Sequence, residues 1–343
     1  MRLSDRQKLI LTLIIHEHIR TAQPVGSKTL VEKYNLTMSS ATIRNEMADL
    51  TDYGLLRQPH TSAGRIPTEE GYRFFVGNLI QKTGLPTNTR RTITHQFYQS
   101  RQDVEQWLRL AASVLANQSQ AASLVTAPHS DKAIFKHLEL IATRGRQVLM
   151  VLVLMGGEIR QQFISLAESV PQERLSEIAN LLSQLCVRCD ANQMSHIRGQ
   201  LDTLSQDILD ILLVEMALIE DSATGEIYLD GMSNVLSEPE FAESDEARQA
   251  LHVLEERSLL ENLLATTMTN TDVGGIQVLI GGEGTWEELR QCSVVLARYG
   301  DPNTLTGSVG VLGPIRMPYD RTISTVRFVA NVLSDLVSET LAV

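Results

Sequence analysis

Residues 26–65 constrain the fold of this chain more than any other stretch of its sequence. A short helical segment leads to Asn35, and a polar turn then opens a second helix with the small and hydrogen-bonding residues 39–45. Residues 55–60 and 65–68 flank a tip that contains Gly64, and this pattern predicts a two-stranded β-ribbon. The order of these elements predicts a helix-turn-helix followed by a ribbon, which is the arrangement of a winged helix-turn-helix.

Local signals predict where the helix before this stretch begins and ends. Ser4 and Gln7 have the spacing of a capping box, in which each side chain bonds the backbone N–H of the other residue. Pro24 predicts the end of the helix, because proline lacks the N–H that a helix interior needs. The expected core face of this helix consists of Leu9, Ile10, Leu13 and Ile14.

The second helix of the motif is predicted to have Ser39 or Ser40 as its N-cap. Apolar residues spaced four and three apart form one buried stripe, namely Ile43, Met47 and Leu50. Arg44 and Asn45 lie off that stripe, and these side-chain types make paired hydrogen bonds with guanine and adenine edges. A capped surface helix without a partner is the alternative interpretation.

The predicted DNA contacts are divided between this helix and the ribbon. Arg44 and Asn45, with Ser40 and Thr42, are expected in the major groove. The residues expected to position the DNA backbone or enter the minor groove are Lys28, His60, Thr61, Ser62 and Arg65. The complete set of candidate DNA-binding residues is Lys28, Ser39, Ser40, Thr42, Arg44, Asn45, His60, Thr61, Ser62 and Arg65. A solvated hairpin is the alternative interpretation of the ribbon.

Charge is distributed unevenly along this chain of 343 residues, whose net charge is −11. Residues 1–82 contain 11 lysines and arginines against 8 aspartates and glutamates, whereas the remaining residues contain 19 against 33. Only the first segment offers phosphate groups an attractive field, and the acidic remainder discourages non-specific adhesion to polyanions. The charge pattern therefore supports a DNA-binding role for residues 1–82.

Several sequence blocks closely resemble the HrcA family of heat-inducible transcription repressors. They are residues 24–27 (PVGS), 39–47 (SSATIRNEM), 59–68 (PHTSAGRIPT) with 71–73 (GYR), and 313–317 (GPIRM) with Tyr319. The resemblance spans nearly the whole chain. It implies a dimeric repressor that binds an inverted-repeat operator upstream of chaperone operons, depends on the chaperonin for its active form, and is relieved on heat stress.

The rest of the chain is predicted to be α+β and to form more than one domain. Gly84 and Pro86 indicate a linker, and the apolar residues that follow predict one helix that includes Phe97, Val104 and Trp107. Residues 147–155 and 158–166 flank Gly156-Gly157 and predict a β-hairpin. Further strands are expected near residues 276–280, 292–299 and 308–312, before a C-terminal helix over residues 320–341.

Because a hairpin alone is not a stable sheet, the simplest architecture joins these strands in one α+β domain that an insertion interrupts. The resemblance implies that the interrupted domain is GAF-like and that the insertion mediates dimerisation. The expected boundaries are 1–82 for the winged-helix domain, 83–94 for the linker, 95–170 and 272–343 for the two parts of the GAF-like domain, and 171–271 for the inserted dimerisation domain.

The expected insertion contains a strand over residues 226–231 and a helix over residues 208–219. This helix is apolar around most of its circumference, so it must be buried in a core or by a partner. Symmetric dimerisation is therefore a hypothesis, against which a monomer in light scattering would count heavily.

The sequence contains few signs of a metal site, a redox site or a catalytic site. Cys186 and Cys189, with His196 and Cys292, are compatible with a zinc or redox site, but no second cysteine pair follows. Residues 281–284 lack the remaining features of a phosphate loop, and residues 307–310 lack the spacing of a nucleophile elbow. The sequence therefore predicts no enzymatic activity, no cofactor and no metal. A regulator controlled by a small ligand in the GAF-like domain and a sensor that uses Cys186 and Cys189 stay open as alternatives.

The expected compartment is the cytoplasm, with association to the nucleoid when the protein is bound to DNA. No apolar run approaches the roughly 20 residues of a membrane span, and the first residues lack an apolar signal core. Three cysteines do not make a disulfide framework. The expected partners are double-stranded operator DNA, a second copy of the chain and the chaperonin, without a membrane.

Overall fold

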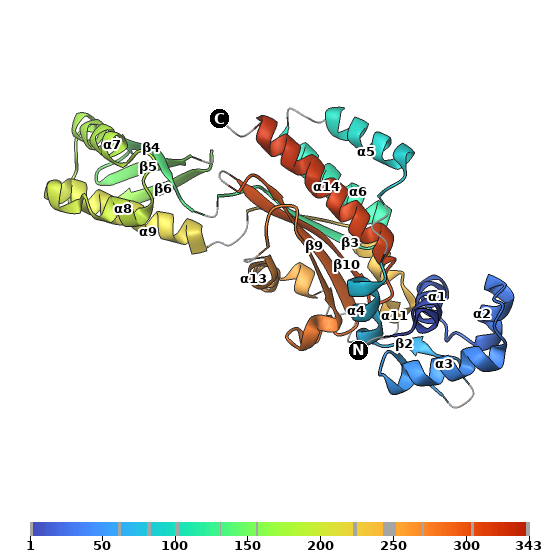
Figure 1. Ribbon diagram of the computed structural model, residues 1–343. Coiled ribbons are helices and arrows are strands. Elements are labelled where there is room, and N and C mark those ends of the chain that lie inside the picture. The colour runs from blue at the N-terminus through green and yellow to red at the C-terminus, as the bar shows by residue number, and fades with distance from the viewer. Residues whose placement is uncertain are drawn as a thin grey trace. The chain divides into compact units, whose positions relative to one another are not determined.

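The computed structural model describes residues 3–60, 63–80, 84–99, 103–130, 132–155, 157–221, 225–242, 252–268, 271–302 and 305–340. The chain mixes helices and strands and divides into two compact units (Figure 1). Unit 1 comprises Met1–Thr126, Ile227–Arg298 and Ser308–Val332, and unit 2 comprises Ala127–Glu226, Tyr299–Gly307 and Leu333–Val343. The predicted α+β class is confirmed. No helix within the described ranges is both long and apolar enough to cross a membrane.

Unit 1 begins with a small helical part, which we call the head (described residues within 3–80). Its elements are α1 (Asp5–Thr21), α2 (Ser27–Tyr34), α3 (Ser40–Asp52), β1 (Leu56–Arg57), β2 (Ile66–Pro67) and α4 (Glu69–Asn78). The capping box of Ser4 and Gln7 is present, as predicted. The two strands pair in antiparallel fashion, with Leu56 opposite Pro67. The ribbon therefore connects α3 to α4.

The predicted core face of α1 is partly wrong. Leu9 is 45% exposed, Leu13 is only half-buried, and the fully buried face consists of Ile10, Leu11, Ile14 and Ile15. The run of apolar residues from 9 to 15 allows more than one stripe at helical spacing. Contacts with α3, α4 and β2 select the stripe that is buried.

The rest of unit 1 is built on a five-stranded sheet, which we call the central sheet. Its strand order is β7 (Ile227–Asp230), β3 (Ala122–Thr126), β10 (Thr306–Pro314), β9 (Cys292–Gly300) and β8 (Ile276–Ile280). Helices α5 (Thr87–Gln99), α6 (Val104–Ser119) and α14 (Tyr319–Thr340) lie on one side of the sheet and α13 (Arg257–Met268) on the other (Figure 1). Alternate residues of β9 face opposite sides, so Val294 and Leu296 join the core around α13.

Short segments join these elements along the edges of the central sheet. They are α10 (Met232–Leu236), α11 (Pro239–Ala242), η2 (Gly281–Gly284) and η3 (Glu287–Leu289). Two of them, α11 and η2, carry acidic residues that contact arginines elsewhere in unit 1.

Unit 2 contains a three-stranded antiparallel sheet of β4 (Phe135–Ala142), β5 (Gln147–Leu154) and β6 (Ile159–Ser165). Its helices are α7 (Gln172–Cys186), α8 (Ala191–Ser195), η1 (Arg198–Gln200) and α9 (Thr203–Asp221). One face of the sheet and these helices enclose a core that includes Leu138, Met150 and Leu212. The other face aligns Ile141, Leu149 and Phe163 across the strands.

The predicted hairpin over residues 147–166 is present, but the expectation that it joins the sheet of β8–β10 is wrong. It pairs with β4, which the sequence did not predict, and these strands form a separate sheet. The strand expected at residues 226–231 is β7, and it pairs with β3 in the central sheet. The segment that interrupts the central sheet is therefore Ala127–Glu226.

The expected linker and the helix after it also differ from the structure. Helix α5 begins at Thr87, inside the segment 83–94, and its partner α6 starts at Val104, so the single expected helix is two helices. Thr87–Gln99 covers α6 with Ile93 and Phe97, which are both buried. Tertiary packing thus orders a segment whose composition resembles a linker.

Candidate nucleic-acid interface

The start of α3 is held by a cap that fixes which residues point outward. The Ser39 hydroxyl accepts a hydrogen bond from the Thr42 backbone N–H at 3.1 Å, and the two hydroxyls lie 2.9 Å apart. Ser39 is therefore the N-cap, and the predicted buried stripe of Ile43, Met47 and Leu50 is confirmed. The hydroxyls of Ser39 and Thr42 are therefore both engaged in the cap of α3.

Arg44 and Asn45 are exposed on α3, beside the buried stripe. Neither side chain makes a hydrogen bond or an ion pair with another residue of the described ranges. Farther along the same helix, the exposed residues are Asp49 and Asp52, which repel phosphates. The geometry therefore leaves the N-terminal half of α3 as the part of this helix suited to a nucleic acid, as in recognition helices.

The ribbon is anchored to the segment between α1 and α2. Val25 and Arg65 form an isolated antiparallel bridge, and an added Cβ at Gly64 would lie 2.3 Å from the Val25 carbonyl oxygen. Arg65 is half-buried, and its Nε is a buried donor without a partner among the described residues. His60 is exposed, whereas Thr61 and Ser62 lie outside the described residues.

Lys28 lies in the first turn of α2 and is exposed, so α2, α3 and the ribbon each carry a candidate contact. A buried carboxylate fixes α2 on α1. Glu17 accepts hydrogen bonds from Arg20 at 2.7 Å, from Lys33 and from Tyr34 at 3.3 Å. Hydrogen bonding to Arg20 lowers the pKa of Glu17, with Lys33 acting in the same direction, so this carboxylate is ionised at neutral pH.

The sequence reasoning missed Arg57, an exposed arginine on β1 of the ribbon. It lines a cleft of about 670 Å³ together with His18, Arg73, Glu240 and residues of the 290–316 region. Its position in the β-ribbon of a locally basic segment was a sequence signal for this residue, but only residues near the tip of the ribbon were predicted as contacts.

Head and central sheet meet beside this cleft. The Tyr72 hydroxyl lies 2.7 Å from His18 Nδ1, and the ring of Tyr72 lies 5.9 Å from that of Tyr319. Burial, aided by the nearby Arg316, lowers the pKa of His18 to about 4, so His18 is neutral at neutral pH. Burial also raises the pKa of Tyr72 well above its usual value. The pair of His18 and Tyr72 is therefore neutral, and it lies beside the charged Arg316.

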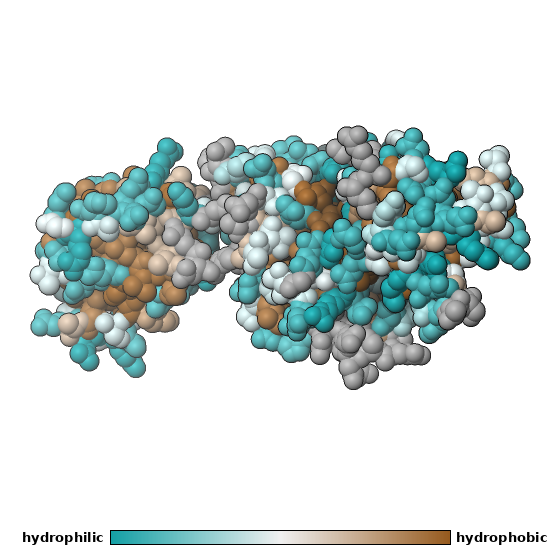
Figure 2. All heavy atoms as spheres, turned by 60° about the horizontal axis from the view of Figure 1, so that its bottom comes forward, coloured by the Kyte–Doolittle hydropathy of each residue, from teal (hydrophilic) through white to brown (hydrophobic). Residues whose placement is uncertain are grey.

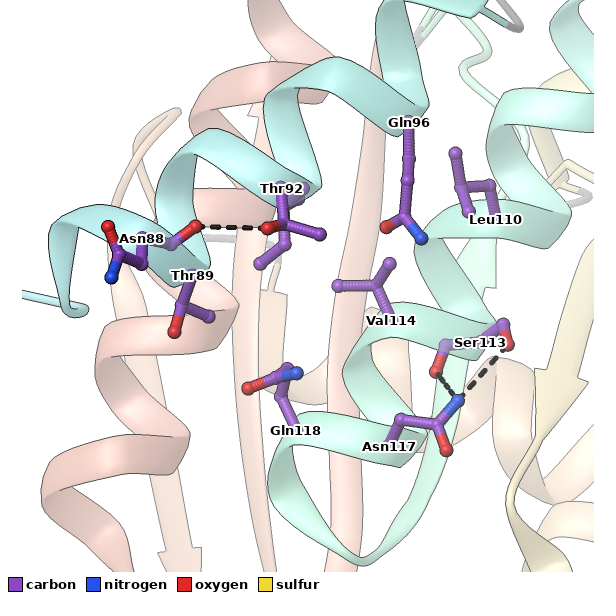
Figure 3. A pocket seen from close by; sticks show the side chains of 10 residues that line it. Asn88, Thr89, Thr92, Gln96, Leu110, Ser113, Val114, Asn117 and Gln118 are labelled. Atoms are coloured by element: carbon purple, nitrogen blue, oxygen red, sulfur yellow. Dashed lines mark hydrogen bonds between the residues drawn. The ribbon is translucent and has the colours of Figure 1, made fainter.

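A second pocket lies between α5 and α6 and has a volume of about 380 Å³. In Figure 3 the side chains of Thr92 and Gln96 from α5 point toward α6, which contributes Ser113, Asn117 and Gln118 to the lining, and Asn88 lies at its edge. These side chains are polar and uncharged, and Asn117 bonds the backbone carbonyl and hydroxyl of Ser113. Ile93, Leu110 and Val114 complete the lining, so the pocket mixes apolar and uncharged polar side chains and, among the described residues, contains no charged group that could orient a ligand.

The cysteines do not assemble a metal site. Cys186 and Cys292 are buried, and Cys189 is half-buried. Within the ranges that the structure describes, no group of three or more His, Cys, Asp or Glu residues is arranged to hold a metal ion.

Comparison with known proteins places the chain in a family. The family model described as "HrcA protein C terminal domain" matches residues 105–323. A heat-inducible transcription repressor HrcA of Roseiflexus castenholzii is 42% identical over 98% of this chain and 95% of its own length. The repressor of the same name from Thermomicrobium roseum is 39% identical over 99% of this chain and 97% of its own length.

One solved structure is similar over the whole length. It is described as the crystal structure of a hypothetical protein at 2.2 Å resolution, with a TM-score of 0.63 and 25% sequence identity, and the match covers 99% of this chain and 100% of that one. The sequence blocks, the family model and the full-length relatives agree with one another. The chain therefore belongs to the HrcA family of heat-inducible transcription repressors.

Proposed function

We propose that this repressor binds an inverted-repeat operator as a homodimer, with each head acting as a winged helix-turn-helix. Arg44 and Asn45 read base edges in the major groove, assisted by Ser40 and Thr42. The residues that position the DNA backbone or enter the minor groove are Lys28, His60, Thr61, Ser62 and Arg65, and Ser39 is a further contact at the start of α3. The observation that carries this proposal is the exposed pair Arg44 and Asn45 next to a capped helix start.

The test compares Arg44→Ala with two other arginine variants. The probe is an inverted repeat that the wild-type protein selects from random duplexes, with a scrambled duplex beside it. Arg44→Ala should weaken binding to the repeat by about 1–3 kcal/mol and reduce its preference over the scrambled duplex. Arg65→Ala should weaken binding to both duplexes similarly, because a phosphate contact does not depend on sequence.

Arg91→Ala is the matched control. Arg91 is an exposed arginine on α5, so its loss removes the same charge outside the head. This variant should bind both duplexes as the wild type does. Unchanged selectivity of Arg44→Ala would show that α3 is not the reading helix.

Unit 2 is the proposed dimerisation domain, and the central sheet with its helices is the proposed GAF-like domain. Hydrophobic surface gathers over the unit that contains β4–β6 (Figure 2, left). Phe163 is 65% exposed on the sheet face opposite the helices, in the same row as Ile141, which is 44% exposed. An uncovered apolar sheet face of this kind is typical of an interface. We therefore assign this face to the second copy.

Light scattering tests the assembly. The wild type should have the mass of a dimer at micromolar concentration, and Phe163→Glu should have the mass of a monomer, because a charge in the apolar contact opposes association. Tyr98→Glu is the control, since Tyr98 is 71% exposed on α5, which belongs to unit 1. A monomeric wild-type protein would contradict the dimer, and a dimeric Phe163→Glu variant would contradict this choice of face.

We further propose that the operator lies upstream of chaperone operons and that the chaperonin supports the active form, as the family resemblance implies. The protein then acts in the cytoplasm, on the nucleoid, and has no enzymatic activity. Footprinting of such a promoter with and without purified chaperonin tests both statements. Protection that does not change with the chaperonin would contradict its role as a modulator.

A further inference from the structure

Arg316 lies where the segment between β10 and α14 meets the head, and its side chain is only 12% exposed. Its Nη1 donates a hydrogen bond to the backbone carbonyl of Ile19 on α1 at 3.2 Å. That carbonyl belongs to the last turn of α1, where helix carbonyls lack partners inside the helix and favour a cation. One arginine of the central-sheet part therefore caps the first helix of the head.

The same guanidinium is fixed from the other side by two carboxylates. Nε and Nη2 bond the two carboxylate oxygens of Glu240, the second at 3.0 Å, and Nη2 also bonds Glu238. A planar guanidinium that pairs bidentately with a carboxylate has a defined direction, which a lysine ammonium lacks. We call this group of Arg316, Glu238, Glu240 and the Ile19 carbonyl the clasp.

Contacts next to the clasp come from the same short segment and from β8. Tyr319 donates a hydrogen bond to the Ile315 carbonyl at 2.6 Å and lies beside Tyr72 of α4. Arg73, also on α4, donates a hydrogen bond to the Ile280 carbonyl at 2.8 Å. Helices α1 and α4 are thus both fixed to the central-sheet part, and Arg316 is the more deeply buried of the two arginines that make these contacts.

The geometry points to Arg316 as a positioning residue for operator binding, which holds the head in one orientation on the central-sheet part. This role rests on the proposed binding of a dimer to an inverted repeat. When both heads are held, binding of the second half-site needs little further ordering, so the full repeat is bound much more tightly than one half-site. Holding the heads also restricts which spacings between half-sites are bound, because half-sites must lie on compatible faces of the duplex.

Arg316→Met tests this role on three duplexes: the selected inverted repeat, a single half-site, and the repeat with its spacer lengthened by about half a helical turn, roughly 5 base pairs. The variant should bind the native repeat at least tenfold more weakly, bind the half-site as the wild type does, and lose most of the preference for the native spacing. A variant that only damages the fold of the head would weaken the half-site equally.

Further variants test whether the head is held by the directed hydrogen bonds of the Arg316 guanidinium or by its positive charge alone. Arg316→Lys should recover only part of the affinity and spacing preference, whereas Arg316→Glu combined with Glu240→Arg should recover more than either single change. Arg321→Met is the matched control, because Arg321 is an exposed arginine on α14 that bonds Gln118, and it should behave as the wild type.

The measurements distinguish failure of the proposed dimeric binding from failure of the positioning role of Arg316. If the wild type bound the repeat no better than the half-site, the proposed dimeric binding would be wrong. If the wild type showed that preference and Arg316→Met kept both the affinity and the spacing preference, the positioning role would be overturned. Tighter binding of the native repeat by Arg316→Met would also overturn it, because the clasp would then oppose operator binding.

Discussion

Val25 and Arg65 exchange two backbone hydrogen bonds, each 2.9 Å long. The second strand of the ribbon is thereby paired with the segment before α2 as well as with β1. Gly64 precedes this pair and lies so close to Val25 that a side chain cannot fit without a shift of the backbone. The position of the ribbon relative to α2 and α3 therefore depends on a glycine.

Gly64→Ala should lower the free energy of unfolding of the head by on the order of 2 kcal/mol, because its Cβ would overlap the Val25 backbone. Urea denaturation followed by circular dichroism measures this loss, and DNA affinity should fall with it. Gly77→Ala is the matched control: no atom lies within 4 Å of its added Cβ, and alanine favours the helix by about 1 kcal/mol. Equal midpoints for the two variants would contradict the close approach.

Glu17→Gln should destabilise the head by about 2 kcal/mol, because it removes a buried charge that accepts hydrogen bonds from Arg20, Lys33 and Tyr34. Glu32→Gln, at an exposed position of α2, should cost little. The lowered pKa of Glu17 also sets a direction with pH. Its contribution to stability is present at neutral pH and is lost as the pH falls through the carboxyl range, so the difference between wild type and Glu17→Gln should shrink in acid. A difference independent of pH would contradict this origin.

The head was predictable from the sequence because its signals are local. The Ser39 cap and the spacing of Ile43, Met47 and Leu50 lie within one helix, and they define the exposed side that carries Arg44. The core face of α1 was less predictable, because several apolar stripes compete and only the packing of α3 and α4 decides between them.

The allocation of strands to sheets depends on pairings that no local pattern encodes. Ser123 of β3 lies opposite Asp230 of β7, more than 100 residues later, and β3 is a short strand buried along its whole length. A buried strand shows no alternation of polar and apolar residues, so its period cannot reveal it. The contact between Arg316 and Ile19 was also not predictable, because the two residues are 297 positions apart in the sequence.

The thiols should differ in reactivity. Burial raises the pKa of Cys186 to about 11 and that of Cys292 to about 12, so both are protonated at neutral pH, and a protonated buried thiol is a poor nucleophile. An aromatic disulfide reagent should therefore label Cys189 in the folded repressor well before the other two, and Cys189→Ser should remove the fast phase. Rapid labelling of Cys186, or operator binding lost on mild oxidation and regained on reduction, would instead support a redox sensor.

His18 should make the stability of the repressor depend on pH in mildly acidic solution. Burial, aided by Arg316, lowers its pKa from 6.5 to about 4, so between these values the unfolded chain binds a proton that the folded chain does not. The free energy of unfolding should thus be highest above about pH 6.5 and fall towards pH 4, by at most about 3 kcal/mol from this group.

Urea denaturation at intervals from pH 4.5 to pH 7.5 measures the slope for the wild type and for His18→Gln. The variant is expected to be less stable at neutral pH, because the contact with Tyr72 changes, but its stability should depend less on pH over this interval. His60→Gln, at an exposed histidine of the ribbon, should keep the wild-type slope. If His18→Gln kept that slope as well, the acid sensitivity would arise from another group, and His18 would not be buried in its neutral form beside Tyr72.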